Sequence, residues 1–449
     1  MWDRHGPGAV PGLAFFYLLF LLAACSPVKA PVPPPPGNAA AVSVKPAYAT
    51  EAEKLNAGIE HGLTLIGKQP GDTLLPLEVV SLYQERARLT GDYENYAKAE
   101  ALLAGVPAAS PPSASLCFAR ARLHYTLHRI KSARAALDTC PANADSAELA
   151  ALHSDIALYS GRYRAAEEGY RALVNGVGTP AHYVRLGLLK KWLGSPGEAA
   201  AFIEAAEKRY HAGAPVMLAW LKLQRGLIAL DRGRLDEALA LYWLASDALG
   251  GWWLIDEHIA EVLHLSGKTQ EARKMYEDIV ARTGNPEFMD ALAAIERELG
   301  HADAAKRLTQ QARAIYEKWL AAFPEAAAGH ALEHFLQDAA DAKYALTLAQ
   351  KNFDTRPYGE SDITLAKAWM LNGKADRAVP LIEAQLANGW DTAEAYWVLG
   401  EAMAQSGVPQ GAQKAQQAKA EALRRNPRSE KMYAYAPLIG APKSSGPRQ

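Results

Sequence analysis

One short pattern recurs along most of this sequence and constrains its fold more than any other feature. A glycine is followed five residues later by an alanine, and a small residue stands seven positions before the glycine. The complete copies contain the glycines Gly161, Gly194, Gly233, Gly267, Gly300, Gly373 and Gly407, the alanines Ala166, Ala199, Ala238, Ala272, Ala305, Ala378 and Ala412, and the small residues Ser154, Gly187, Gly226, Ala260, Ala293, Ala366 and Gly400. A period of roughly 34 residues indicates an array of similar structural units.

Each copy has the features of a helical hairpin. The glycine suits the left-handed residue that ends a first helix, and an acid such as Glu198, Glu237 or Glu271 suits the start of a second helix. The small residues are expected where the two helices approach most closely. Weaker copies turn near residues 91, 128 and 340, so we expect about ten hairpins in all.

Two stretches carry the pattern most fully. Residues 259–276 read IAEVLHLSGKTQEARKMY, and residues 228–239 read IALDRGRLDEAL. Both stretches resemble the tetratricopeptide repeat (TPR) family. The resemblance implies an all-α fold, a right-handed α-solenoid of stacked antiparallel helical hairpins, which we place at residues 51–425. The family is a recognition class, so the resemblance implies a binding function and no particular reaction.

The first residues are typical of a targeting signal. The apolar run at residues 13–22 is too short to span a bilayer and fits a secretory signal. It ends in Leu22-Ala23-Ala24-Cys25, which resembles a bacterial lipobox. The resemblance implies a signal peptide at residues 1–24 and lipid on Cys25, and Ser26 favours the outer membrane, with the chain facing the periplasm. The alternatives are an uncleaved anchor or an ordinary signal with a chance cysteine.

Composition sets the remaining boundaries and limits the partners. Proline is dense after Cys25, so residues 25–50 are expected to form an extended tether. Residues 426–449 are expected to form a flexible tail.

The chain has 48 Lys+Arg against 49 Asp+Glu and a formal net charge of -1. This balance argues against nucleic acid as the main partner. The sequence leaves the oligomeric state open.

Only two cysteines follow the lipobox, Cys117 and Cys140. They are equidistant from the hairpin turn expected near residue 128, and residues equidistant from such a turn lie opposite each other. An exported chain occupies an oxidising compartment. We therefore expect a disulfide, which would stabilise the fold by about 3 kcal/mol. The alternative is a pair of buried thiols.

The TPR resemblance also implies which side chains face the concave groove. The candidate groove contacts are Trp192, Trp220, Glu257, Glu261, Asp290 and Trp397. Aromatic and acidic groups together would suit a peptide that carries Lys or Arg beside apolar residues. The tryptophans could instead pack between repeats as core, or could bind a glycan directly.

One motif has the spacing of a metal site. His330, Glu333 and His334 form an H-x-x-E-H sequence, the spacing of inverzincin peptidases. An open groove offers no dry pocket for catalysis, so ordinary surface is the preferred interpretation. The set His258, Glu261 and His264 spreads over ~120° of a helix and is also interpreted as surface.

The leading interpretation is a non-enzymatic protein-interaction scaffold without a cofactor or metal, lipid-anchored to the outer membrane and facing the periplasm. It would bind a protein or peptide partner in an envelope assembly, secretion or polysaccharide-export system. The alternatives are a metal-dependent hydrolase that uses residues 330–334 and a glycan-binding solenoid.

Overall fold

The computed structural model describes residues 47–107, 113–141, 146–337, 341–407 and 409–433. All long regular elements in these ranges are α-helices. The 22 helices are α1 (Ala47–Lys68), α2 (Leu75–Thr90), α3 (Glu94–Ala104), α4 (Ala114–Thr126), α5 (Ile130–Asp138), α6 (Ala147–Tyr159), α7 (Tyr163–Asn175), α8 (Pro180–Trp192), α9 (Pro196–Arg209), α10 (Pro215–Leu230), α11 (Leu235–Ala248), α12 (Trp253–Leu265), α13 (Thr269–Thr283), α14 (Pro286–Glu298), α15 (Ala302–Ala322), α16 (Pro324–Leu336), α17 (Ala342–Thr355), α18 (Gly359–Leu371), α19 (Ala375–Ala387), α20 (Ala393–Gln405), α21 (Gly411–Arg425) and α22 (Ser429–Tyr433).

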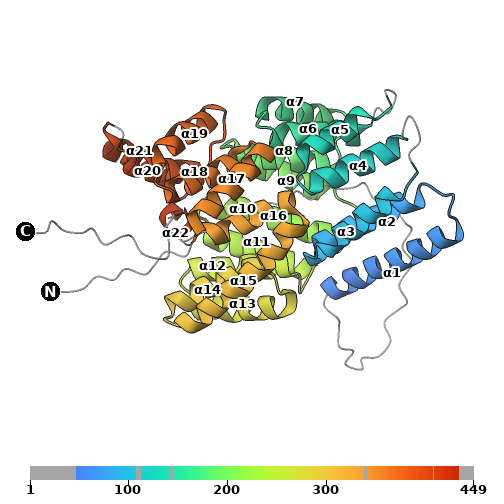
Figure 1. Ribbon diagram of the computed structural model, residues 1–449, viewed down its shortest axis with the longest axis horizontal. Coiled ribbons are helices and arrows are strands. Elements are labelled where there is room, and N and C mark those ends of the chain that lie inside the picture. The colour runs from blue at the N-terminus through green and yellow to red at the C-terminus, as the bar shows by residue number, and fades with distance from the viewer. Residues whose placement is uncertain (1–46, 108–112, 142–145, 338–340, 408, 434–449) are drawn as a thin grey trace, which may run out of the picture.

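The helices from α2 to α21 pack as ten consecutive hairpins, each even-numbered helix against the odd-numbered helix that follows it. The first helices of successive hairpins also touch, as α2 with α4 and α18 with α20. Figure 1 shows the resulting stacked array. The expected all-α fold of stacked helical hairpins is confirmed, with the expected number of hairpins.

Local backbone geometry explains the glycine positions in the repeat. The seven repeat glycines have φ between +68° and +84°, the left-handed region that penalises other residues. The turn near residue 128 uses a histidine instead, and His128 has φ of 59°. Each glycine thus ends a first helix as the pattern predicts.

The small residues of the repeat also lie where the pattern predicts. A Cβ atom added to Gly226 of α10 would lie 2.2 Å from the ring of Tyr242 on α11. One added to Gly187 of α8 would lie 2.9 Å from Ile203 on α9. The paired helices are therefore too close for a larger side chain at these positions.

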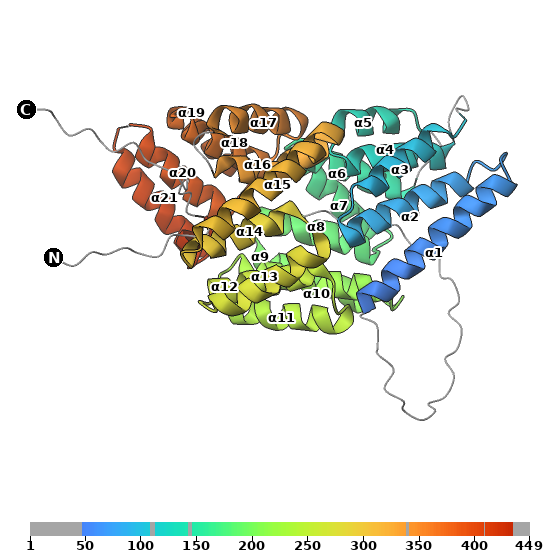
Figure 2. The same ribbon diagram turned by 60° about the horizontal axis from the view of Figure 1, so that its bottom comes forward.

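The array curves until its later hairpins contact its earlier ones (Figures 1 and 2). Backbone carbonyls near the start of the array accept hydrogen bonds from side chains far along the chain. The Trp253 indole donates to the carbonyl of Leu89, 164 residues away, and the Asn388 amide donates to that of Gly161, 227 residues away. The hairpins therefore enclose the inner face of the curve instead of lining an open groove.

The ends of the helical domain differ from the expected boundaries. Helix α1 begins at Ala47, where the proline-rich tether was expected to run to residue 50. The segment 426–433, expected to be part of a flexible tail, is packed: Asn426 is buried, and its amide donates to the Leu230 carbonyl at 3.3 Å. Helix α22 follows and contacts α20 and α21. The described domain thus covers residues 47–433, because both end segments bury side chains against it.

The expected signal peptide, the lipidated Cys25 and most of the tether lie outside the described residues, as does the tail from residue 434. Among the helices described, none combines the length and apolar character that crossing a membrane requires.

The structure joins Cys117 of α4 to Cys140, which follows α5, by a disulfide with 5.4 Å between the two Cα atoms. The bond links the two helices of one hairpin across a sequence separation of 23 residues.

Candidate functional site

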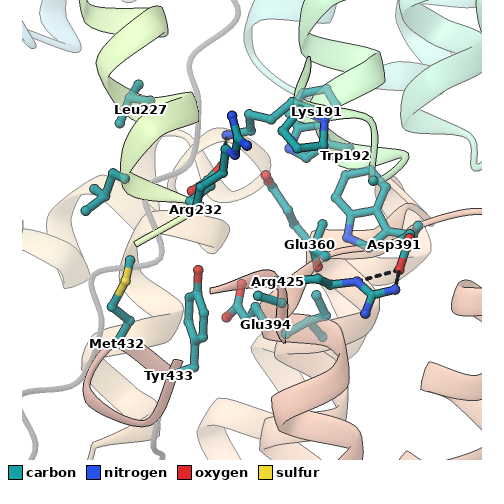
Figure 3. Close-up of a pocket in the computed structure, with 18 of the residues that line it drawn as sticks. Lys191, Trp192, Leu227, Arg232, Glu360, Asp391, Glu394, Arg425, Met432 and Tyr433 are labelled. Atoms are coloured by element: carbon teal, nitrogen blue, oxygen red, sulfur yellow. Dashed lines mark hydrogen bonds and ion pairs between the residues drawn. The ribbon is translucent and has the colours of Figure 1, made fainter. Parts of the chain in front are cut away.

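A cavity of about 380 Å³ lies between early and late hairpins (Figure 3). It opens where the ends of α8 and α10 meet the starts of α18 and α20 and helices α21 and α22. Its lining includes Lys191, Trp192, Leu227, Leu230, Asp231, Arg232, Glu261, Glu360, Trp390, Asp391, Glu394, Arg425, Met432 and Tyr433. We call this the central cavity.

Two tryptophans form one wall of the central cavity. The indole rings of Trp192 and Trp390 stack with centroids 5.3 Å apart, and the Asp391 backbone N–H donates to the Trp192 carbonyl at 2.9 Å. Gly359 leaves room for Trp390, because a Cβ added there would lie 2.0 Å from the indole. This wall exists only because the two halves of the array meet.

Most charges around the central cavity are held in ion pairs. Lys191 lies 2.8 Å from Asp231, and Arg425 donates to Asp391 at 2.9 Å. Arg232 is half-buried, and its side chain has no hydrogen-bond or ion-pair partner within the described parts of the chain. Its guanidinium is therefore available to a ligand.

Carboxylates lie across the central cavity from these bases. Figure 3 shows Arg232 and Lys191 on one side, with Glu394 and Tyr433 on the other. Burial raises the pKa of Glu360 to about 7, although the Tyr358 hydroxyl, which is hydrogen-bonded to it, acts in the opposite direction. A cationic group entering the cavity would favour the ionised form of Glu360.

The carboxylate of Glu394 forms an ion pair with the buried Lys367. Lys367 lies 2.9 Å from Glu394 and 3.3 Å from Glu333. Burial opposes the charge on Lys367, but the two carboxylates outweigh it and raise the pKa of Lys367. The geometry of the cavity therefore combines both signs of charge with an aromatic wall, which suits recognition of an amphipathic, charged segment.

The structure does not place the predicted groove contacts on an open groove. Trp192 and Glu261 line the central cavity, and Trp192 is itself buried. The other four, Trp220, Glu257, Asp290 and Trp397, are buried among neighbouring helices. The prediction of a partner-facing surface is wrong for these four, because neighbouring helices cover them: Asp290 pairs with His334 of α16, for example, and Lys419 of α21 lies over the Trp397 ring.

The H-x-x-E-H motif does not converge on one point. His330 is hydrogen-bonded through Nδ1 to Glu287, and His334 Nδ1 lies 2.9 Å from Asp290. Glu333 instead pairs with Lys367. The three side chains thus pair with three different residues, two of them on α14 and one on α18.

The second histidine set was wrongly interpreted as surface. His258 and His264 are both buried on α12, and His264 Nε2 lies 3.3 Å from Glu298, away from the other two. His258 Nδ1 instead faces two carboxylates, those of Glu257 and Glu261, at 3.2 Å each. In the sequence, the cluster of Glu257, His258 and Glu261 could have been recognised from two glutamates four residues apart with a histidine directly after the first.

Comparisons with known proteins find similarity in structure alone. No protein-family profile matches the chain, and no curated protein matches it in sequence. Solved structures that superpose on it include MamA, which is 16% identical, with 37% of this chain and 95% of that chain covered and a TM-score of 0.30. Pseudomonas aeruginosa PilF is 15% identical over 45% of this chain and 92% of its own, with a TM-score of 0.37. A human IFIT1 dimer with PPP-AAAA is 12% identical over 83% and 94%, also with a TM-score of 0.37.

These superpositions are loose, so the class of protein rests on the chain's own features. Ten stacked helix pairs, left-handed glycines at the turns and small residues at the helix crossings define an α-helical repeat protein, which is consistent with the resemblance to tetratricopeptide repeats.

Proposed function

We propose that this chain is a non-enzymatic scaffold that binds a partner protein in the central cavity. We further propose that lipid on Cys25 anchors it to the outer membrane, facing the periplasm, within an envelope assembly, secretion or polysaccharide-export system. The partner would present a peptide segment that carries Lys or Arg beside apolar residues.

One observation carries the proposal: the central cavity places the guanidinium of Arg232 and the carboxyl group of Glu360 next to an aromatic wall. The side chain of Arg232 has no hydrogen-bond or ion-pair partner in the described ranges, and the half-buried Glu360 accepts a hydrogen bond from the uncharged Tyr358 hydroxyl. A partner segment with a cation facing Glu360 and a carbonyl or carboxylate facing Arg232 would satisfy both groups. Leu227, Met432 and the indoles would cover the apolar part of the segment.

The anchoring part of the proposal rests on Leu22-Ala23-Ala24-Cys25 and on the proline-rich segment after it. Several acyl chains hold a protein on a membrane where one does not. Metabolic labelling with an alkyne fatty acid should label the wild-type chain and place it in the outer-membrane fraction. The Cys25→Ser variant should lack the label and leave the membrane. A labelled variant, or wild type in the inner membrane, would refute this part.

Site-specific photocrosslinking tests the binding part. A photoreactive amino acid replaces Arg232, which is half-buried in the cavity lining, or Arg164, whose side chain is 93% exposed on α7. Illumination of cells should give an adduct of discrete mass at position 232 and none at 164. The near-isosteric Glu360→Gln substitution should weaken the adduct by removing the facing charge.

Two outcomes would refute a partner in the central cavity. One is the absence of an adduct at position 232. The other is an adduct that forms only at Trp243, which is half-exposed on the outer face of α11 beside the exposed Leu244. The second outcome would move recognition to the outside of the array, where an exposed tryptophan is also a favourable anchor.

A further inference from the structure

Three side chains on one turn of α12 bring potential metal-ligand atoms together. In the parts of the chain that the structure describes, Glu257, His258 and Glu261 each contribute one ligand atom, and these atoms lie within 4.8 Å of one another. The imidazole Nδ1 of His258 lies 3.2 Å from a carboxylate oxygen of each glutamate. Residues four apart share a helical face, which explains why the two glutamates converge.

The group is buried, and one of its oxygens is unsatisfied. Glu257 is 0% exposed, and its Oε2 atom, the one nearer to His258, accepts no hydrogen bond from any described residue. Its other oxygen accepts a bond of 3.3 Å from the Tyr276 hydroxyl. An ionised carboxylate at this depth needs a cation or several hydrogen-bond donors to offset its lost hydration.

The surroundings supply little positive charge. The charged neighbours that act on Glu257 are two further carboxylates, those of Glu261 and Glu287, and the group that donates a hydrogen bond to it is the neutral Tyr276 hydroxyl. The ring of Tyr242 stacks on His258 with centroids 5.4 Å apart and holds the imidazole in place. Two carboxylates and one oriented imidazole therefore meet where the protein itself offers no strong cation.

We propose that Glu257, His258 and Glu261 bind one divalent transition-metal ion of the zinc type. Carboxylate oxygen together with imidazole nitrogen is the donor set that such ions prefer. The ion would replace the missing counter-charge between the two glutamates. Three protein ligands leave a further coordination position for water or for an atom of a bound partner.

The site is adjacent to open space. Glu261 is part of the lining of the central cavity, and His258 is part of the lining of a second cavity of about 100 Å³ beside Trp220. An ion that enters one of these cavities can therefore meet Glu261 or His258 without unfolding of α12. Binding of the metal does not require the proposed partner, so the two proposals can fail separately.

The competing explanation is a proton. A protonated His258 between the two glutamates would also offset their charge and would need no metal. Titration of the chelator-treated full-length protein with ZnCl2, and separately with MnCl2, distinguishes the two. Calorimetry and elemental analysis after gel filtration should find one zinc ion per chain. X-ray absorption should show oxygen and nitrogen ligands with an imidazole among them.

Variants identify the ligands. Glu257→Gln and His258→Gln keep the side-chain size and should each weaken zinc binding by at least about tenfold, since even outer partners of a metal site contribute that much. His153→Ala, which changes an exposed histidine on α6, is the matched control and should bind zinc as wild type does. Circular dichroism verifies that each variant is folded.

Zinc should also raise the Tm of the wild type and of His153→Ala, but not that of the Glu257 variant, because an ion that binds only the folded state stabilises it. The proposal is overturned if the wild type retains no stoichiometric zinc. It is also overturned if the Glu257 and His258 variants bind zinc as the wild type does.

Discussion

The indole of Trp192, the last residue of α8, stacks on the indole of Trp390, which lies in the turn before α20, with ring centroids 5.3 Å apart. Trp192 belongs to the fourth of the ten hairpins, and Trp390 lies between the ninth and the tenth. Their contact closes the curve of hairpins and forms one wall of the central cavity.

Removing one of these rings should loosen the closure. Trp390 is almost fully buried, so Trp390→Ala should lower the free energy of unfolding by about 3 to 5 kcal/mol through the lost burial and the cavity left behind. Urea unfolding measures this loss. Trp243→Ala, at a half-exposed site, is the matched control and should change stability by no more than about 0.5 kcal/mol. Equal effects of the two substitutions would contradict the closure.

The helix crossings should reject added side chains. Gly226→Ala places a Cβ atom 2.2 Å from the Tyr242 ring and should destabilise the fold by about 1 to 3 kcal/mol. Gly67→Ala in α1 meets nothing within 4 Å and should be neutral or stabilise slightly, since alanine favours helix. Thermal unfolding of both variants checks the difference, and a neutral Gly226 variant would show that the helices are further apart than described.

The disulfide should be detectable and should stabilise the second hairpin. Alkylation of the denatured protein without reduction should leave Cys117 and Cys140 unmodified in mass spectra. The double variant Cys117→Ser, Cys140→Ser should lose about 3 kcal/mol of stability, since the bond closes a loop with a sequence separation of 23 residues. Alkylation of both cysteines before any reduction would refute the bond.

A buried aspartate should make stability depend on pH. Asp362 is 1% exposed, neither of its carboxylate oxygens has a hydrogen-bond partner among the described residues, and burial raises its pKa from 3.8 to about 8. The folded protein then keeps a proton that the unfolded chain has released. The contribution of Asp362 to the free energy of unfolding is therefore present below about pH 4 and is lost as pH rises towards about 8.

Asp362→Asn should remove this dependence. The free energy of unfolding of the variant minus that of the wild type, measured by urea unfolding at pH 5, 7 and 9, should therefore rise with pH, with a slope of at most about 1.4 kcal/mol per pH unit. The variant should gain stability relative to wild type at the higher pH values. Asp247→Asn, at an exposed position on α11, should keep the wild-type profile. If the stability of Asp362→Asn depended on pH as that of the wild type does, Asp362 would not be the source of the pH dependence.

The local structure could be predicted from the sequence because local rules decide it. Gly194 and Gly233 mark turns because only glycine adopts their φ values readily, and Gly226 marks a crossing because Tyr242 fills the space beside it. Each of these constraints acts within a single hairpin. The number of hairpins and the fold class followed from them.

The closure and the site could not be predicted in this way. Trp192 meets Trp390 only after small rotations between many successive hairpins add up, and the repeat pattern does not encode their sum. The same curvature brings the buried Trp220 next to Tyr93 and Tyr96 of the first hairpin, although resemblance alone placed it on an open groove. The hydrogen bond from Asn426 to the Leu230 carbonyl likewise depends on which earlier helices the curved array brings close to its C-terminal end.

The closure of the array is the central claim, because the cavity and the burial of its inner face both depend on it. Asn388 is exposed, and its amide donates to the Gly161 carbonyl at 2.9 Å across 227 residues of sequence. A photoreactive amino acid at position 388 of the full-length protein, followed by peptide mass spectrometry, tests this contact directly. The closed array predicts an intramolecular crosslink to the peptide that contains Gly161. Crosslinks confined to residues near 388 in the sequence would show an open array and contradict the account.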